Sequence, residues 1–283
     1  MSLAFRIIPR LEIKSFNLVK GVNLEGLRVL GAPEVYAEHY YKEGADEIFY
    51  QDVVASLYGR NSLNEIIKKT IKNIFIPLTV GGGIKSLNDI EKILKSGADR
   101  VSINSAAIKN PKLVKEAVKK FGSSTIVVSI EAGKQLNGDY KAFTHNGREN
   151  SNINVIDWIK KVEDLGAGEI FVTSIDRDGT GRGFDIQLAK IISQKVKIPF
   201  IFHGGAGKMK DIIDLVDNSN VSAVSLSSML HYDFLSKNNY RKSHSIKTGN
   251  VEYLSGKKLP KNINQKSILS IKKFLKKKQI YCS

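Results

Sequence analysis

The stretch KEGADEIFYQDV at residues 42–53 decides the fold, because EDLGAGEIFVTSID at residues 163–176 repeats its centre. In both stretches a glycine and an alanine precede Glu-Ile-Phe, and an apolar run typical of a buried strand follows. The matching glycines, Gly44 and Gly166, are 122 residues apart. Two further pairs repeat at similar offsets: VGGGIKSLNDI (80–90) with FHGGAGKMKDI (202–212), and VSINSA (101–106) with VSLSSM (224–229). The repeats predict a barrel made of two similar halves.

Apolar runs alternate with amphipathic segments along the whole chain. Ile153, Ile156, Ile159 and Val162, for example, recur at helical spacing between two such runs. Eight runs read as strands: residues 5–13, 47–53, 76–82, 100–104, 125–130, 169–175, 198–204 and 222–228. Eight strands alternating with helices predict a (β/α)8 TIM barrel that forms one domain over residues 1–283. A doubly wound open sheet is the alternative, and the missing GxGxxG motif disfavours it.

The bulk composition is that of a protein with one sizeable core. The chain is 42% hydrophobic and 25% charged. It has no apolar run of about 18 residues and no signal-peptide pattern, so no membrane partner is expected. Cys282 is the only cysteine, which excludes disulfide scaffolds and multi-cysteine metal sites. We therefore expect a cytoplasmic protein without a metal or another cofactor.

The positive charge is concentrated at the C-terminal end. Of the formal net charge of +16, residues 237–283 contribute +12, from twelve lysines, one arginine and a single acid, Glu252. A solvated lysine-rich tail is the preferred interpretation, and a tail that binds an acidic partner is the alternative. Because the charge is local and aromatic residues do not interleave it, we do not expect a nucleic-acid partner.

Two glutamates stand where predicted strands end. Glu12 ends the apolar run of RIIPRLEIK, and Glu131 ends that of VVSIEAGK at residues 127–134. The carboxyl ends of barrel strands form the active-site face, so the two acids are predicted to share one pocket. Each could instead form a salt bridge with a neighbouring lysine, but their symmetric placement favours general acid–base catalysis.

Glycine-rich turns follow corresponding strands in each half. GGGIKS (81–86) and GGAGKM (204–209) each open a predicted helix, and NSAA (104–107) and SSML (227–230) follow the next strands. Such turns let backbone N–H groups approach a phosphate, and a helix N-terminus favours an anion. The pattern predicts one phosphate site in each half and a substrate with a phosphate at each end.

Four charged residues begin apolar runs and should meet at the opposite end of the barrel: Arg6, Glu47, Arg100 and Glu169. Two cations and two anions at strand starts can form a closed ring of salt bridges. The ring is interpreted either as a polar plug that seals the core or as a gate. A gate is considered because apolar residues could seal the same place without the free-energy cost of desolvating charges.

With these motifs the chain resembles the cyclase subunit of imidazole glycerol phosphate synthase, a (β/α)8 barrel of histidine biosynthesis. The resemblance covers about residues 5–232 and resumes near 266–280. Its motifs are LVKGVNLEGLR (18–28), VGGGIKSL (80–87), GADRVSINSAA (97–107), GAGEIFVTSIDRDGTG (166–181) and GGAGKM (204–209). The resemblance implies that a glutaminase subunit docks at the barrel bottom and that ammonia passes through the barrel to the top.

The resemblance also implies roles for particular residues. Arg6, Glu47, Arg100 and Glu169 would be the ammonia gate, and Asp99 would face the glutaminase. Phosphate positions map onto Gly83, Asn104 and Ser105 in the first half and Gly179, Gly205 and Ser228 in the second. Lys20, Asp52 and Asp176 match further pocket positions.

Several positions depart from the family pattern. The family uses two catalytic aspartates where this chain has Glu12 and Glu131, a lysine where Arg100 stands, and a small residue where His203 stands. His203 is interpreted either as a new acid–base group or as a buried, hydrogen-bonded histidine. A basic segment at about residues 237–265 is inserted before the last helix, on the mouth side, where it could reshape the pocket or contact another protein.

These departures leave three functions open. The first is an ammonia-dependent synthase subunit that delivers ammonia to an acceptor other than the cyclase substrate. The acceptor could be a surface-polysaccharide sugar that gains an acetamidino group. An amidotransferase would then be a third protein of the complex. The second is the true cyclase of histidine biosynthesis. The third is a non-catalytic scaffold for a glutaminase complex, which the retained phosphate motifs disfavour.

Overall fold

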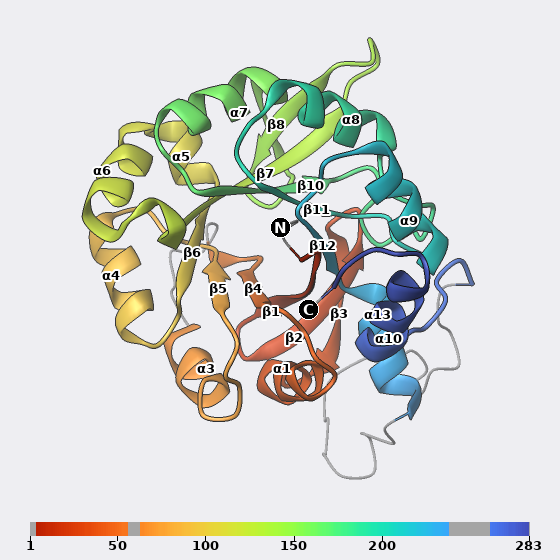
Figure 1. The fold of residues 1–283 in the computed structure, drawn as a ribbon. Helices are drawn as coiled ribbons and strands as arrows, with labels where there is room; N and C mark the ends of the chain where they lie inside the picture. The colour runs from red at the N-terminus through yellow and green to blue at the C-terminus, as the bar shows by residue number, and fades with distance from the viewer. Residues whose placement is uncertain (1–3, 56–62, 238–260, 283) are drawn as a thin grey trace.

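The fold is a closed barrel of eight parallel strands inside a ring of helices (Figure 1). The computed structural model describes residues 4–55, 63–237 and 261–282. The barrel strands are β1 (Arg6–Lys14), β4 (Ile48–Asp52), β5 (Leu78–Gly81), β6 (Arg100–Ile103), β7 (Ile126–Lys134), β10 (Glu169–Ser174), β11 (Phe200–His203) and β12 (Ala223–Leu226). They pair in chain order, and β12 pairs with β1 to close the barrel. The predicted (β/α)8 barrel is confirmed.

Helices connect the strands on the outside of the barrel. They are α1 (Pro33–Lys42), α3 (Leu63–Thr70), α4 (Leu87–Lys95), α5 (Ser105–Lys109), α6 (Lys112–Phe121), α7 (Val155–Asp164), α8 (Ile186–Lys195), α9 (Met209–Asn218), α10 (Ser228–Lys237) and α13 (Ile268–Lys277), with a short 3-10 turn η1 (Ser123–Thr125) before β7. The spacing that predicted a helix around residues 153–166 corresponds to α7, whose Trp158, Ile159 and Val162 are buried. None of the helices in these ranges is long and apolar enough to cross a membrane.

The two-residue period of β1 divides the core into two layers. Ile7, Leu11 and Ile13 belong to the large cluster between strands and helices. Ile8, which alternates with them, belongs to a separate cluster inside the barrel. Successive side chains of a strand point to opposite faces, so Arg10 and Glu12 share the inner face with Ile8. The inner face of β1 therefore changes from apolar to charged as it approaches the mouth.

Each half of the barrel extends its first strand with an antiparallel hairpin, which the sequence analysis did not predict. β2 (Asn17–Val22) and β3 (Glu25–Gly31) follow β1, and β8 (Tyr140–Thr144) and β9 (Glu149–Asn154) follow β7. Glu12 pairs with Val19, and Glu131 pairs with Phe143. The two hairpins lie on opposite sides of the barrel (Figure 1). They place both glutamates beside a second chain segment.

The predicted insertion at residues 237–265 is described only at its two ends, since residues 238–260 lie outside the described ranges. Lys237 ends α10. At the other end, the Asn264 N–H donates to the carbonyl of Gly207 at 2.7 Å, and Ile263 is buried. This end of the insertion therefore packs on the loop that follows β11.

Candidate active site at the barrel mouth

A cavity of about 780 Å³ opens at the mouth between the strand ends of the first half and the segment 129–149 of the second half. The cavity contains five residues predicted from the sequence: Asp52, Gly83, Asn104, Ser105 and Glu131. Its volume falls within the range of small-molecule sites. The structure thus brings four predicted first-half residues together with Glu131 of the second half.

Lys85 and Lys109 also line this cavity and were not singled out in the sequence. Both side chains are exposed on the cavity rim. Two ammonium groups beside the backbone turn at Gly83 give this side of the mouth the charge that an anionic ligand requires.

Glu131 lies in this cavity with its side chain almost wholly buried. Its Oε2 accepts hydrogen bonds from Asn104 Nδ2 at 2.8 Å and from the Gly147 N–H at 2.9 Å. Burial raises the pKa of Glu131 to about 7, although Arg10, Gly147 and Asn104 favour the carboxylate. A carboxyl group that titrates near neutrality can both donate and accept a proton.

Several buried polar atoms along this cavity have no hydrogen-bond partner within the described ranges. They include Ser102 Oγ, Asn104 Oδ1 and both amide atoms of Asn146. Ser102 is 2% exposed and Asn146 is 7% exposed. Buried polar groups are normally hydrogen-bonded, so these atoms mark the place of a polar ligand.

Glu12, the symmetry partner of Glu131, has very different surroundings. Lys20 Nζ contacts Glu12 Oε2 at 3.1 Å and Asp178 Oδ2 at 2.9 Å, and Arg10 Nε lies 3.6 Å from Glu12 Oε1. All four side chains are 1% exposed. For Glu12, the salt-bridge alternative is confirmed. Arg10 and Lys20 balance the charges of the two carboxylates.

The same network includes His203. Its Nε2 lies 3.1 Å from Asp178 Oδ1, and its Nδ1 lies 2.9 Å from the Ser225 carbonyl oxygen. Burial lowers the pKa of His203, while Asp178 opposes that effect. Burial favours the neutral acid of Asp178, but Lys20 and His203 hold its pKa well below the usual range. Both interpretations of His203 stay open, because the histidine is buried and hydrogen-bonded and yet touches a carboxylate.

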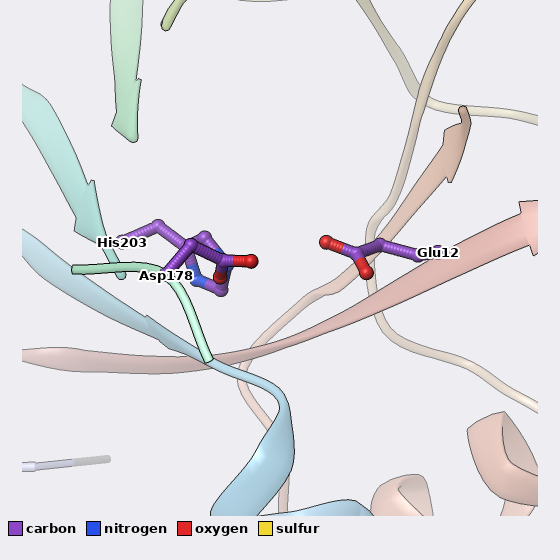
Figure 2. Close-up of side chains that lie close together, drawn as sticks. All are labelled: Glu12, Asp178 and His203. Atoms are coloured by element: carbon purple, nitrogen blue, oxygen red, sulfur yellow. The ribbon is translucent and has the colours of Figure 1, made fainter. Parts of the chain in front are cut away.

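Glu12, Asp178 and His203 have the donor types of a metal site, and their ligand atoms lie within 4.8 Å of one another. Figure 2 shows Glu12 facing the other two side chains across the mouth. The Lys20 ammonium contacts both carboxylates. A metal ion would therefore have to displace a buried cation that already satisfies them. The residues present fit an ion-pair network better than a metal.

The second predicted phosphate site is almost filled. Gly179, His203, Gly205 and Ser228 surround a cavity of only about 20 Å³. The Gly183 N–H donates to the Gly205 carbonyl at 2.8 Å, which ties two of the surrounding loops together. The predicted residues are thus brought together, but in a space far smaller than that of the first half.

The helix starts after β5 and β11 are already capped by acids. Asp89 Oδ2 accepts from the Lys85 N–H at 3.0 Å, and Asp211 Oδ2 accepts from the N–H groups of Gly207 and Lys208, both at 2.8 Å. These three N–H groups, which precede the helices, are therefore already occupied, and phosphate binding at the two helix starts stays a prediction. An anion at this mouth would have to use the preceding turns and side chains.

Asp176 does not lie in either cavity. Its carboxylate accepts from the Lys134 N–H at 2.8 Å. Asp178, two residues later in the same IDRDG stretch, is the buried acid of the ion-pair network. Both aspartates follow the strand, and only the turn decides that Asp178 joins the ion-pair network; the pocket role of Asp176 stays a prediction.

Arg10 is a further residue that the sequence analysis missed. Its Nη1 donates to Thr173 Oγ1 at 2.8 Å, and its guanidinium lies 5.5 Å from the centre of the Phe171 ring. Thr173 belongs to β10, which is separated from β1 by β11 and β12, so Arg10 reaches across the interior. Its alternation with Ile8 and Glu12 along the strand could have revealed an inward arginine.

The four charges at the barrel bottom form the predicted ring. Arg100 Nη1 lies 2.7 Å from Glu169 Oε2 and 3.4 Å from Glu47 Oε2. Arg6 Nη1 lies 3.3 Å from Glu47 Oε2, and Arg6 also pairs with Glu169. Burial raises the pKa of Glu47, and Arg100 and Arg6 oppose that rise. The ring is part of the wall of a second cavity, of about 680 Å³, which opens at the bottom.

Asp99 is exposed on this bottom face, as a partner-facing residue must be. Its Oδ2 accepts from the Leu78 N–H at 2.8 Å, so the carboxylate also fixes the start of β5.

An apolar layer separates the ring from the mouth. It consists of Ile8, Phe49, Val127, Phe171, Ile201 and Ala223. The ring centres of Phe49 and Phe171 are 4.2 Å apart. Arg10 lies above this layer, so the interior changes from charged to apolar and back to charged along the barrel axis.

The protein is a two-halved (β/α)8 barrel with a buried glutamate in a polar mouth cavity and a charged ring at the other end. The chain belongs to the family of histidine biosynthesis proteins, which it matches over residues 6–236. It is 54% identical over 206 residues to "Imidazole glycerol phosphate synthase subunit HisF" of Legionella pneumophila, covering 73% of this chain and 97% of that protein. A protein of the same name from Clostridium botulinum (strain Okra / Type B1) is 45% identical over 232 residues, covering 82% of this chain and 92% of the relative.

Proposed function

We propose that this chain is a cyclase-subunit-like synthase that uses ammonia on a phosphorylated small molecule bound at the mouth. A glutaminase subunit docked at the barrel bottom supplies the ammonia. The observation that carries the proposal is the arrangement of the charged ring and Glu131 at opposite ends of one barrel interior. The relatives named as HisF subunits support the same reaction class.

The barrel interior favours neutral ammonia over ammonium. The apolar layer around Phe49 and Phe171 offers no partner for a charged ion, and Arg10 above it repels a cation. Ammonia is a nucleophile only in its neutral form, so this path delivers the reactive species. Because Phe49 and Phe171 are packed together, their side chains must move for ammonia to pass.

At the mouth, Glu131 serves as the proton donor and acceptor of the reaction. Its pKa of about 7 lets it exchange a proton at neutral pH. Glu12 does not line the open cavity and forms ion pairs with Lys20 and Arg10. The two glutamates therefore have different surroundings and different roles.

The acceptor of the ammonia is proposed to differ from that of the histidine-pathway cyclase. Glutamate is longer than aspartate by one methylene, which moves each carboxylate by roughly 1.5 Å. A misplacement of about 1 Å can cost on the order of 10²-fold in rate. Glu12 is also locked in ion pairs. An acceptor such as a surface-polysaccharide sugar that gains an acetamidino group fits these changes, and the native cyclase reaction is the second candidate.

The first experiment uses the purified protein alone, with excess ammonium salt at alkaline pH and the ribulosyl-formimino substrate of the family. Ammonium salt removes the need for a glutaminase. Turnover at ordinary enzyme rates, lost by about 10²-fold or more in Glu131→Gln, would establish the native cyclase reaction. No turnover together with binding at the mouth would favour another acceptor. Neither turnover nor binding would leave only the scaffold function.

A second experiment tests the docking of the glutaminase. Asp99→Asn removes the charge but keeps an acceptor for the Leu78 N–H. We expect glutamine-supported turnover to fall while ammonium-supported turnover stays unchanged. Equal losses with both nitrogen sources would show that Asp99 is structural and would contradict its role at the interface.

A further inference from the structure

We infer that the outward face of helix α13 binds the surface of an anionic lipid membrane. This face consists of Leu269, Lys273, Lys276 and Lys277, and we call it the lysine face. Helix α13 lies in the outer ring of helices, whereas the mouth cavity and the charged ring lie at the two ends of the barrel (Figure 1). Binding through this face would leave both ends free, so the inference does not depend on the proposed function.

The lysine face is held outward by the burial of the opposite side of α13. Its four residues recur at i, i+4, i+7 and i+8, which places them on one side of a helix. On the other side, Ile268, Ile271 and Leu275 are completely buried and fix the rotation of the helix. The three lysines are exposed, and Leu269 is 50% exposed. The face therefore presents three ammonium groups and one apolar side chain to the surroundings.

The lysines around α13 differ from those of other surface helices in having few acidic partners. Residues 261–282 contain seven lysines and no aspartate, glutamate or arginine. Within the described part of the chain, only Lys272 of these seven forms an ion pair, with Asp46. By contrast, α1, α4, α9 and α10 each have a lysine that pairs with an acid one turn away. The lysine face is thus an uncompensated positive surface that an anionic partner can neutralise.

Helix stability accounts for only part of the lysine face. The helix dipole favours cations in the last turn, which explains Lys276 and Lys277. Lys273 precedes that turn, and the exposed Leu269 contributes nothing to the dipole. Tyr281, just beyond the helix, is 65% exposed. Lysines beside exposed apolar and aromatic side chains are typical of segments that lie at a membrane interface.

The composition of this segment favours a lipid surface over an acidic protein or a nucleic acid. Lysine is a point charge that attracts many headgroups at once, whereas arginine forms the bidentate contacts of specific carboxylate and phosphate recognition. Residues 261–282 contain no arginine. The lysine face is also the outer side of a helix, which a flat bilayer can approach. Peripheral binding of this kind needs no membrane-spanning helix.

The test is co-sedimentation of the full-length protein with lipid vesicles. We expect binding to vesicles that contain phosphatidylcholine and phosphatidylglycerol in equal amounts, and no binding to vesicles of phosphatidylcholine alone. Added salt should weaken the binding, because it screens exposed charges.

Variants locate the binding surface. Lys273→Gln/Lys277→Gln removes two exposed charges and should weaken vesicle binding by about 25-fold, at about fivefold per lysine. The matched control is Lys115→Gln/Lys119→Gln, which removes the same charge at the same spacing from α6, on the opposite side of the barrel (Figure 1). It should change binding by less than about twofold. Leu269→Ser should weaken binding by about fivefold, because less apolar surface leaves water.

Three results would overturn the inference. Equal binding to both kinds of vesicle, or binding to neither, would exclude an anionic lipid surface as the partner. Equal losses in the two double variants would show that net charge alone drives the binding. Tighter binding to polyglutamate or to single-stranded RNA than to the vesicles would assign the lysine face to an acidic macromolecule. A thermal melt checks that each variant is folded, as expected for substitutions at exposed positions.

Discussion

The two halves of the barrel place a glutamate at the same point and give it opposite surroundings. Glu131 is a buried carboxyl with neutral hydrogen-bond donors beside an open cavity. Glu12 is a carboxylate in a closed ion-pair network. The strand and hairpin that carry them are similar, so the difference arises from the side chains around each glutamate.

One pair of residues accounts for much of this difference. Glu12 pairs with Val19, and Glu131 pairs with Phe143, so Lys20 and Thr144 hold corresponding places one residue further along each hairpin. Lys20 supplies an ammonium group to Glu12, whereas Thr144 lines the open cavity. Internal symmetry of the backbone thus fixes where the acids lie, and the hairpin side chain is one of the residues that decide which partners each acid has.

The largest expected effect comes from Lys20→Thr, which gives the hairpin after β1 the residue that the hairpin after β7 has at the corresponding place. Loss of the ammonium leaves Glu12 and Asp178 buried without their main counter-charge, which should lower the free energy of unfolding by about 3–5 kcal/mol. Chemical denaturation at neutral pH measures the loss. The exposed Lys85→Thr is the matched control and should change stability by less than about 0.5 kcal/mol. Equal losses in the two variants would contradict the comparison.

Next in size is the pH dependence of stability caused by Glu131. Its folded-state pKa of about 7 lies above the ordinary value of 4.5, so the native state binds more protons than the unfolded state between these pH values. Stability should fall as pH rises through this window, by about 3 kcal/mol at most. Glu131→Gln should remove that fall, since the amide oxygen can still accept from Asn104 and Gly147. Denaturation curves at pH values below and above the window check it, and parallel curves for both proteins would refute it.

A smaller contrast is expected between the two glycine turns. Gly205→Ala combines a φ of +111° with a contact of 2.2 Å to the Gly183 carbonyl, and should cost about 2–3 kcal/mol. Gly83 has a φ of +70°, which an alanine can adopt, so Gly83→Ala should cost about 1 kcal/mol. Thermal melts of the two variants measure the difference. A larger loss at Gly83 would show that the first half is the more tightly packed one.

The smallest effect is expected from Thr144→Lys, which gives the hairpin after β7 the residue that the hairpin after β1 has at the corresponding place. A lysine ammonium within reach of Glu131 should lower the pKa of that carboxyl from about 7 by about one unit. A ¹³C-carboxyl NMR titration measures the shift directly. Thr144→Met, which adds length without charge, is the control and should not lower the pKa. An unchanged value in Thr144→Lys would show that position 144 does not correspond to position 20.

The sequence predicted those features of the fold that depend on the spacing of apolar residues and on the internal repeat. The eight strands follow from apolar runs at a repeating spacing, and the ring of Arg6, Glu47, Arg100 and Glu169 follows from their common place at strand starts. The residues of the first-half cavity were found for the same reason, because the ends of neighbouring parallel strands must meet at one mouth.

The sequence analysis failed where direction within a turn or register across a hairpin decides the outcome. Asp176 and Asp178 both follow β10, and only the folded turn shows that Asp178 is the inner acid. Lys20 is eight positions after Glu12, and only the pairing of β1 with β2 brings the two charges to 3.1 Å.

The sequence by itself therefore determined the barrel, its two halves and the positions of the two glutamates, because these depend on hydrophobic periodicity and internal repetition. Tertiary structure alone decided that one half is open and the other closed. That difference depends on which distant side chains fill the space beside each glutamate, as Arg10, Lys20 and His203 do for Glu12, and on the free energy of burying their charges together.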